Sequence, residues 1–280
     1  MATASLLATR AAEPDFTKSI CSVIFPPGTA VARMFVLAKA AGFSAVELRL
    51  DVDLLESGNV RSLAQDNGIE IASLWVSQAL AQHPLNSPDA AIRAKGVDDI
   101  RRACDIAAVV HCGALLLVPG RVTPVTGYEE TWKRITEELT KCLPVAESNR
   151  VLLTVENVWN KFLLSPLEMR TFVDRFHSPW LAAHFDIGNV MQFGYPEDWV
   201  RTLGSRIRRV HVKDYKVSTR AEQGRFMPLF EGDVNFAGVM RALREVNYSG
   251  YLSPEIEYDP GQPDQLGNVS RQLDRILTLA

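Results

Sequence analysis

The sequence predicts an α/β fold, a single (β/α)8 TIM barrel, from three observations. Short apolar strands alternate with helix-period segments along all 280 residues, which is typical of parallel sheets with crossover helices. Eight such strands can be counted, and no linker or shift in composition divides them. The length also fits the ~250 residues of a barrel that folds as one unit. We therefore expect a loose tail over residues 1–17 and one barrel domain over residues 18–280.

The eight strands are short runs of mostly apolar residues bounded by turn residues. In chain order we expect them at residues 19–25, 44–50, 69–75, 114–118, 151–156, 181–186, 207–212 and 251–257. A doubly wound sheet is the alternative fold. However, the loop after the first strand reads PPG and lacks the GxGxxG pattern of a dinucleotide site.

Helix boundaries between these strands carry recognisable signals. Residues 165–168 read SPLE, which predicts a capping box with proline at the first helical position. Residues 126–129 have the same Ser/Thr-x-x-Glu form, and residues 87–89 are expected to open the long helix before the fourth strand. Gly42 and Gly68 stand where a helix should end and the next strand begin.

Composition excludes several classes of protein. Lys and Arg number 30 against 33 Asp and Glu, a net charge of −3, which provides no basic surface for a nucleic-acid backbone. No apolar run approaches the ~18 residues of a transmembrane helix, and the N-terminal segment lacks the apolar core of a secretory signal. The four cysteines have no C-x-x-C spacing and are expected to be reduced. We therefore expect a cytoplasmic protein that binds neither nucleic acid nor membrane, with a trimmed export signal as the alternative origin of the tail.

Candidate metal ligands end each of the last four predicted strands. They are Glu156, Asp186, His211 and Glu255. Each is about the fifth or sixth residue of its strand, so all four should stand at one height at the C-terminal rim, where barrels carry their active sites. Three carboxylates and one imidazole suit a hard or borderline divalent cation. Mn²⁺ is favoured, with Mg²⁺ and Co²⁺ as alternatives. Glu257 shares a face with Glu255, but its height matches the other ligands less well.

Several segments resemble the sugar isomerase/epimerase superfamily, whose members are xylose isomerase-like TIM barrels. These segments read ENVWNKFLLSPLE, FDIGNV, RVHVKD, EGDVNF and GYLSPEIE. The resemblance is closest to L-xylulose-5-phosphate 3-epimerases, ketose 3-epimerases and hydroxypyruvate isomerases. It implies a small-molecule sugar or sugar phosphate as substrate and one divalent ion held by the four residues named above. It also implies that Glu156 and Glu255 serve as the acid/base pair.

The residues agree with such a mechanism. Two oxygens of a 2-keto sugar could chelate the ion, which would stabilise an enediolate as a Lewis acid. Glu156 and Glu255 come from strands three steps apart, so one could remove the C3 proton and the other return a proton to the opposite face. We therefore predict a ketose 3-epimerase. The alternatives are an aldose–ketose or hydroxypyruvate-type isomerase, if one glutamate serves a single face, and an inosose-type dehydratase.

Five further side chains are candidates for substrate binding: Lys213, Asn189, Glu47, Trp159 and Arg225. Lys213 could bind a substrate hydroxyl or phosphate, or pair with a carboxylate. Glu47 could contact a substrate hydroxyl or form an internal ion pair with Arg49. Trp159 could form a wall of the sugar pocket or simply pack. Arg225 could hold a phosphate or remain solvated.

One position departs from the family pattern. Many relatives have histidine three residues after the strand-six aspartate, where this chain has Asn189. Asparagine can donate a hydrogen bond to a substrate oxygen but cannot ligate a second metal as imidazole does. An endonuclease-IV-like nuclease needs three metals and extra histidines, whereas this chain has five histidines in all. A non-catalytic sugar-binding barrel should have lost a ligand. A homo-oligomer, dimer or tetramer, is compatible with the resemblance.

Overall fold

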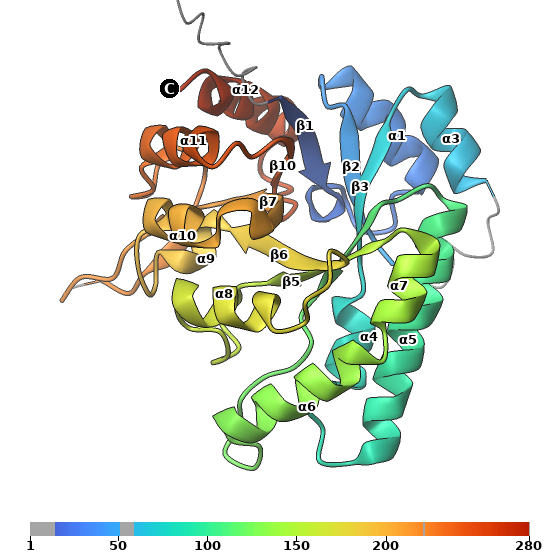
Figure 1. Ribbon diagram of the computed structural model, residues 1–280. Coiled ribbons are helices and arrows are strands. Elements are labelled where there is room, and N and C mark those ends of the chain that lie inside the picture. Colours follow the sequence, from blue (N-terminus) through green and yellow to red (C-terminus); the bar gives the residue numbers. More distant parts are fainter. Residues whose placement is uncertain (1–14, 51–58, 221, 280) are drawn as a thin grey trace, which may run out of the picture.

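The computed structural model describes residues 15–50, 59–220 and 222–279, so residues 1–14 of the expected tail lie outside the described part (Figure 1). Eight parallel strands close into a barrel in the order β1-β10-β7-β6-β5-β4-β3-β2, which confirms the predicted (β/α)8 fold. The strands are β1 Phe16–Cys21, β2 Ala45–Arg49, β3 Glu70–Trp75, β4 Ala114–Leu117, β5 Leu152–Glu156, β6 Leu181–Asp186, β7 Ile207–Val212 and β10 Gly250–Pro254.

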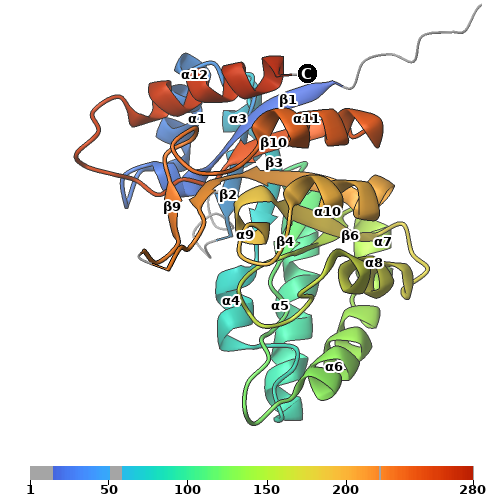
Figure 2. The same cartoon turned by 90° about the vertical axis from the view of Figure 1, so that its left-hand side faces the viewer.

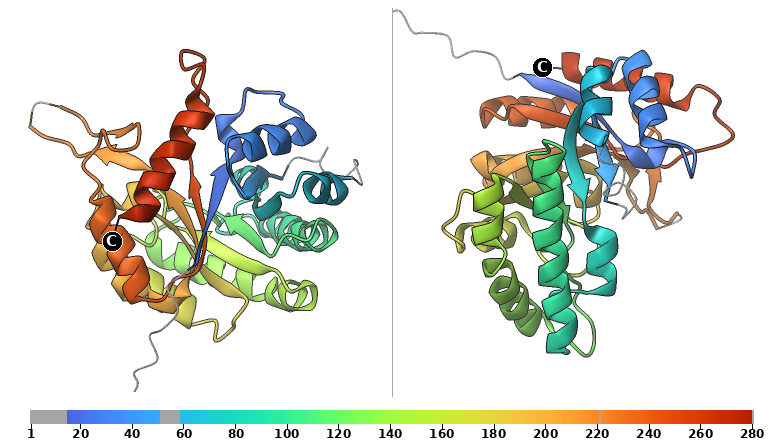
Figure 3. Two further views of the ribbon diagram at one scale, coloured as in Figure 1. Left: turned by 90° about the horizontal axis from the view of Figure 1, so that it is seen from above. Right: turned by 90° about the vertical axis from the view of Figure 1, so that its right-hand side faces the viewer.

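Helices surround this barrel, as the view from above shows (Figure 3). They are α1 Val31–Ala40, α3 Val60–Asp66, α4 Ser77–Gln82, α5 Ala90–Val109, α6 Tyr128–Thr140, α7 Leu143–Asn149, α8 Pro166–Asp174, α9 Ile187–Val190, α10 Pro196–Leu203, α11 Phe236–Glu245 and α12 Gln265–Thr278, with 3-10 turns at Ser22–Ile24 and Gly204–Arg206. Two short strands, β8 Asp214–Lys216 and β9 Arg225–Met227, pair outside the barrel (Figure 2). Among the described helices, none is both long and apolar enough to cross a lipid bilayer.

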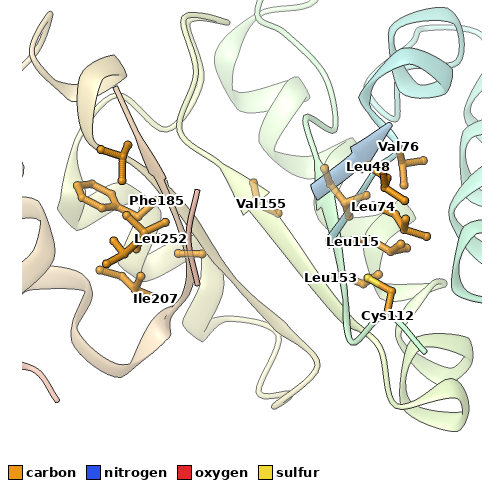
Figure 4. Packing of buried hydrophobic residues seen from close by; sticks show 14 of the residues in the cluster. Leu48, Leu74, Val76, Cys112, Leu115, Leu153, Val155, Phe185, Ile207 and Leu252 are labelled. Carbon is orange, nitrogen blue, oxygen red and sulfur yellow. The ribbon is translucent and has the colours of Figure 1, made fainter. Parts of the chain in front are cut away.

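The two faces of the strands differ in chemistry. Outward-facing side chains are apolar and pack under the helices, as Leu48, Leu115 and Phe185 do in Figure 4. Burying such side chains is worth about 25 cal/mol per Å² of apolar surface, so this layer supplies the main driving force for folding. The barrel interior is polar instead, and its fully buried residues include Glu47, Ser73, Thr154, His184 and His211. Apolar packing outside therefore holds a polar interior in place.

Strand register brings the candidate ligands to one rim. Asp186 at the end of β6 pairs with His211 of β7, and His211 pairs with Ser253 of β10. Glu156, the last residue of β5, pairs with His184. Glu255 follows β10 directly, and its backbone N–H still donates to the carbonyl of Val212 at 3.2 Å.

Two strands, the first and the last, differ from the prediction by more than one residue at an end. The first strand takes in Phe16 and Thr17, which the sequence assigned to the tail, because residues 16–18 pair with β10. It ends at Cys21, where the apolar run continues as a 3-10 turn, so apolar character alone marked its end too late. The last strand ends at Pro254 and not at residue 257, since proline has no N–H for the ladder.

Helix caps follow the predicted signals in part. Ser165 forms the expected capping box with Glu168. Gly42 and Gly68 have φ angles of 87° and 57° between a helix and the next strand, as glycine permits. The expected cap at Thr126 is wrong, because the helix begins one residue later with Gly127 as its N-cap. For the long helix α5, the N-cap is Asp89, whose carboxylate accepts from the Ala91 N–H at 2.8 Å.

The close approach of α5 to the chain after α4 gives a stability prediction. A Cβ at Gly96 would overlap the carbonyl oxygen of His83 and lie 2.8 Å from Leu85 Cδ2. Alanine raises helix propensity by about 1 kcal/mol, but overpacking costs about 1–3 kcal/mol or more. Gly96→Ala should therefore lower the free energy of unfolding in urea. Gly113→Ala is the matched control, because nothing lies within 4 Å of its Cβ position. Equal stability of the two variants would contradict this packing.

Candidate active site

His211 lies at the centre of a group of carboxylates. Its imidazole is fully buried, and Nδ1 lies 3.2 Å from Glu156 Oε1, 3.6 Å from Asp186 Oδ2 and 3.0 Å from Glu255 Oε2. One ligand atom from each of these four residues falls within 4.8 Å of the others. The structure thus brings together the four side chains that the sequence singled out. We call this group the four-ligand cluster.

Hydrogen bonds fix the carboxylate of Asp186. Its Oδ1 caps α9 by accepting from the Asn189 N–H at 2.7 Å. The Asn157 side chain holds the same backbone from both sides, accepting from the Asp186 N–H at 2.8 Å and donating to the Asp186 carbonyl at 2.9 Å. Oδ1 is therefore occupied within the protein, while Oδ2 points into the cluster.

Lys213 is the cation nearest to these carboxylates. Its Nζ lies 3.1 Å from Asp186 Oδ2 and forms an ion pair with Glu255 Oε2. Burial alone would lower the pKa of Lys213, but Asp186, Glu255 and Glu156 raise it. Lys213 therefore stays charged. It comes this close because Gly188 has no side chain, since a Cβ there would lie 2.5 Å from Lys213 Cβ.

The carboxylates of the cluster differ in their affinity for protons. Burial raises the pKa of Glu156 to about 7, against the hydrogen bond and the charge of His211. Burial also acts to raise the pKa of Asp186, but Lys213 and His211 outweigh it and hold that pKa below its usual value. Near neutral pH, Glu156 can therefore hold or release a proton while Asp186 remains ionised.

The cluster fits a divalent cation. Asp186 Oδ2 and Glu255 Oε2 are buried and have no hydrogen-bond partner of normal geometry. Lys213 lies beside both oxygens, but a buried charged acceptor without a well-formed hydrogen bond is costly, and a divalent cation would offset that cost. Three carboxylates and one imidazole nitrogen are ligands that Mn²⁺, Mg²⁺ and Co²⁺ accept.

Glu47 lies on the other side of His211 from the cluster. It is fully buried on β2, and its Oε1 is 2.6 Å from His211 Nε2. Its carboxylate thus pairs with the imidazole and not with Arg49, whose guanidinium stacks 5.8 Å from the Trp75 ring. Sequence reasoning offered Arg49 as an ion-pair partner, and that alternative is wrong, because the strand points Glu47 inward beneath His211. A contact between Glu47 and a substrate hydroxyl stays a prediction.

The structure places the remaining predicted substrate residues around the rim. Asn189 is committed to the loop scaffold, because its Nδ2 donates to the Asn157 carbonyl at 3.0 Å. Trp159 is half exposed, donates from Nε1 to the Asn189 carbonyl at 3.0 Å, and stacks on Phe226 at a centroid distance of 5.1 Å. Arg225 lies exposed on β9, and no contact within the described residues joins it to the cluster.

Some residues of the site were not predicted. Phe226 of the β8-β9 hairpin lies beneath the Lys213 ammonium, 5.3 Å from Nζ to the ring centroid. Asp214 anchors the loop after β9 by accepting from the N–H groups of Gly232 and Val234 at 2.9 and 3.2 Å. Ser73 lies inward on β3, so period-2 alternation could have indicated its position. No local signal marks Phe226, because a long loop carries it to the rim.

Two cavities large enough for a small ligand have Trp75 or Trp159 in their lining. A cavity of about 450 Å³ is lined by Arg49, Leu50, Trp75, Ser77 and Gln78. A second of about 720 Å³ includes Trp159 and Asn160 in its lining. Trp75 lies 5.8 Å from the His211 ring, between centroids, so the smaller cavity adjoins the buried imidazole. Volumes of this size are typical of small-molecule sites.

Comparisons with known proteins agree on one family. Residues 35–276 match the model of the xylose isomerase-like TIM barrel family. The chain is 28% identical over 228 residues to SgbU of Escherichia coli K12, provisionally assigned as an L-ribulose-5-phosphate 3-epimerase, covering 77% of this chain and 79% of the relative. It is 27% identical over 236 residues to the L-ribulose-5-phosphate 3-epimerase UlaE of Escherichia coli O1:K1, covering 80% and 81%.

A solved structure shows the same fold. The D-allulose 3-epimerase of Methylomonas sp. in complex with D-allulose superposes with a TM-score of 0.78 at 20% identity, covering 95% of this chain and 98% of that one. Identity this low supports the fold and not the substrate. The family match covers the barrel from α1 to α12, including all four residues of the cluster. This chain therefore belongs to the xylose isomerase-like TIM barrel family.

Proposed function

We propose that this chain is a divalent-metal-dependent isomerase that epimerises a ketose or a ketose phosphate at C3. The observation that carries the proposal is the convergence of Glu156, Asp186, His211 and Glu255 on one buried point. The names of the relatives support the type of reaction, because both SgbU and UlaE are named as 3-epimerases of a ketose phosphate.

The four-ligand cluster would hold the cation, and its oxygen-rich donor set favours Mn²⁺. When bound, the cation supplies Lewis-acid stabilisation of the negative charge that develops on the substrate oxygens. Lys213 adds a fixed positive charge beside the same carboxylates. This ammonium could bind a substrate hydroxyl or phosphate oxygen, with Phe226 and Trp159 as the apolar wall of the pocket.

Glu156 and Glu255 are proposed as the acid/base pair. In the barrel order, β5 and β10 are separated by β6 and β7, so the two carboxylates approach the rim from different sides. One glutamate takes the proton from C3 to give an enediolate, and the other returns a proton to the opposite face, which inverts that carbon. Burial raises the pKa of Glu156 to about 7, and a cation bound beside it would lower that pKa and keep the carboxylate ready to act as a base.

The cysteines bear on the cellular location, and two further side chains, Arg225 and Asn189, are proposed to act on the substrate. The four cysteines are all buried and unpaired, which supports a reducing, cytoplasmic location. Arg225 is proposed to hold a substrate phosphate, since its neighbour Phe226 lies beside Lys213 at the rim. Asn189 is proposed to act on the substrate indirectly, since it orders the loop that carries Trp159.

Metal binding tests the ligand assignment. We expect purified protein to bind about one Mn²⁺ per chain by isothermal titration calorimetry. His211→Ala should abolish this binding, because it removes the nitrogen at the centre of the cluster. His83→Ala is the matched control, since that histidine pairs with Asp99 on the outer helices, and its variant should bind as the wild type does. Stoichiometric Mn²⁺ retained by His211→Ala would overturn the assignment.

Solvent labelling tests the reaction. We expect Mn²⁺-loaded protein in D2O to convert a ketose of a panel that includes L-ribulose 5-phosphate, L-ribulose and D-allulose into its C3 epimer. The product of a single turnover should carry deuterium at C3, because the proton returned differs from the proton removed. An aldose product would instead identify an aldose–ketose isomerase, and loss of water would identify a dehydratase. Either result would contradict 3-epimerisation.

Matched variants connect this reaction to the two glutamates. Glu156→Gln and Glu255→Gln each keep an oxygen but lose basicity, so turnover should fall by ~10² or more. Glu257→Gln makes the same change two residues beyond Glu255, on an exposed side chain, and should leave turnover within a few fold. Full turnover by Glu255→Gln together with loss in Glu257→Gln would move the base to Glu257.

A further inference from the structure

Glu47 is the buried carboxylate that the proposed reaction does not use. It stands on β2, across the barrel interior from β7, and is fully buried. Four donors surround its two oxygens. Cys21 Sγ lies at 3.4 Å, His211 Nε2 lies at 2.6 Å, and the Ser73 hydroxyl and the Trp75 indole N–H also donate to it. A carboxylate inside a barrel with this many donors is built to accept hydrogen bonds.

Such surroundings keep Glu47 ionised. The Trp75 indole N–H can only donate, and it donates to Oε1, while the Ser73 hydroxyl donates to Oε2. An ionised carboxylate can only accept hydrogen bonds. The hydrogen between Glu47 and His211 therefore belongs to His211 Nε2.

This position of the hydrogen decides which nitrogen can bind a metal ion. A histidine that binds a metal ion is neutral, so a hydrogen on Nε2 would leave the lone pair of Nδ1 toward Glu156, Asp186 and Glu255, all within 3.6 Å. A lone pair facing three carboxylates is repelled by them unless a cation lies between. Carboxylates that accept the free N–H of a ligating histidine fix its tautomer and raise its basicity.

Neighbouring rings also fix the orientation of this imidazole. His184 packs edge-on against His211, with ring centroids 4.2 Å apart, and Trp75 lies on another side at 5.8 Å. His184 itself contacts Thr154 Oγ1 at 3.3 Å through Nδ1.

A second set of potential ligands is thereby excluded. Cys21, Glu47 and His211 also offer three ligand atoms within 4.8 Å of one another. However, the Cys21 thiol already contacts the Glu47 carboxylate, with Sγ 3.4 Å from Oε1. Glu47 and His211 moreover already share a hydrogen bond. The nitrogen of His211 that faces the four-ligand cluster is therefore Nδ1 and not Nε2.

We propose that Glu47 is a positioning residue, which holds the hydrogen of His211 on Nε2 and so makes Nδ1 the metal ligand. This inference rests on the proposed function, because it presumes that the four-ligand cluster binds a divalent cation. In this role Glu47 contacts His211 and not the substrate. Loss of the Glu47 charge should weaken metal binding, because it acts on His211, although none of the four ligand residues is replaced.

Glu47→Gln tests this role by removing one charge at nearly constant volume. Titration with MnCl2 should give a Kd about 10- to 100-fold higher than that of the wild type. Glu70→Gln is the matched control, because Glu70 lies at the exposed start of β3 and accepts from the Tyr251 hydroxyl at 2.6 Å. Its Mn²⁺ affinity should stay at the wild-type value. An unchanged Kd in folded Glu47→Gln, with only a lower melting temperature, would reduce Glu47 to a structural role and overturn the inference.

A second measurement keeps the inference testable if Glu47→Gln does not fold. The chain has five histidines, so ¹⁵N-histidine labelling gives a spectrum that can be assigned. In wild-type protein loaded with diamagnetic Mg²⁺, His211 should appear with its hydrogen on Nε2. A hydrogen on Nδ1 in the loaded protein would overturn the inference. If the wild type binds no divalent cation at all, the proposed function fails instead, so the two failures are distinguishable.

Discussion

The structure depends on one buried imidazole that stands between carboxylates on both of its nitrogen sides. Nδ1 of His211 faces Glu156, Asp186 and Glu255, while Nε2 contacts Glu47. Four carboxylates around a single ring cannot all remain ionised in a water-poor interior without compensating positive charge. Lys213 provides part of it, and hydrogen-bond donors satisfy Glu47. Asp186 Oδ2 and Glu255 Oε2 lie beside Lys213 but accept no hydrogen bond of normal geometry, and they mark where a further cation would bind.

The barrel makes this concentration of charge possible. Parallel strands all end on one rim, so residues far apart in sequence meet there without any long-range loop. The apolar layer between strands and helices, including Leu115 and Phe185, stabilises the fold independently of the polar interior. Loops then refine the site, as Asp214 does by anchoring the segment after β9. Stability and chemistry thus occupy different faces of the same strands.

The fold and the cluster could be predicted from sequence because both depend on strand periodicity. Glu156, Asp186 and His211 end or nearly end their strands, and a strand end is a local property. The partner of Glu47 could not be predicted, since it lies on β7, 164 residues away, and depends on how the barrel closes. The hydrogen bond from Asn189 to the Asn157 carbonyl could not be predicted for a similar reason, because Asn157 follows a different strand. Strand ends were also misplaced wherever an apolar run continued into a turn, as after Cys21.

The most direct test of the account is anomalous diffraction at the manganese edge from crystals soaked in Mn²⁺. The account predicts a single anomalous peak bonded to His211 Nδ1 and to oxygens of Glu156, Asp186 and Glu255. His211 Nε2 should remain hydrogen-bonded to Glu47 in the same map. A peak on the Nε2 side beside Cys21 and Glu47, or a peak that none of the four ligands touches, would contradict it.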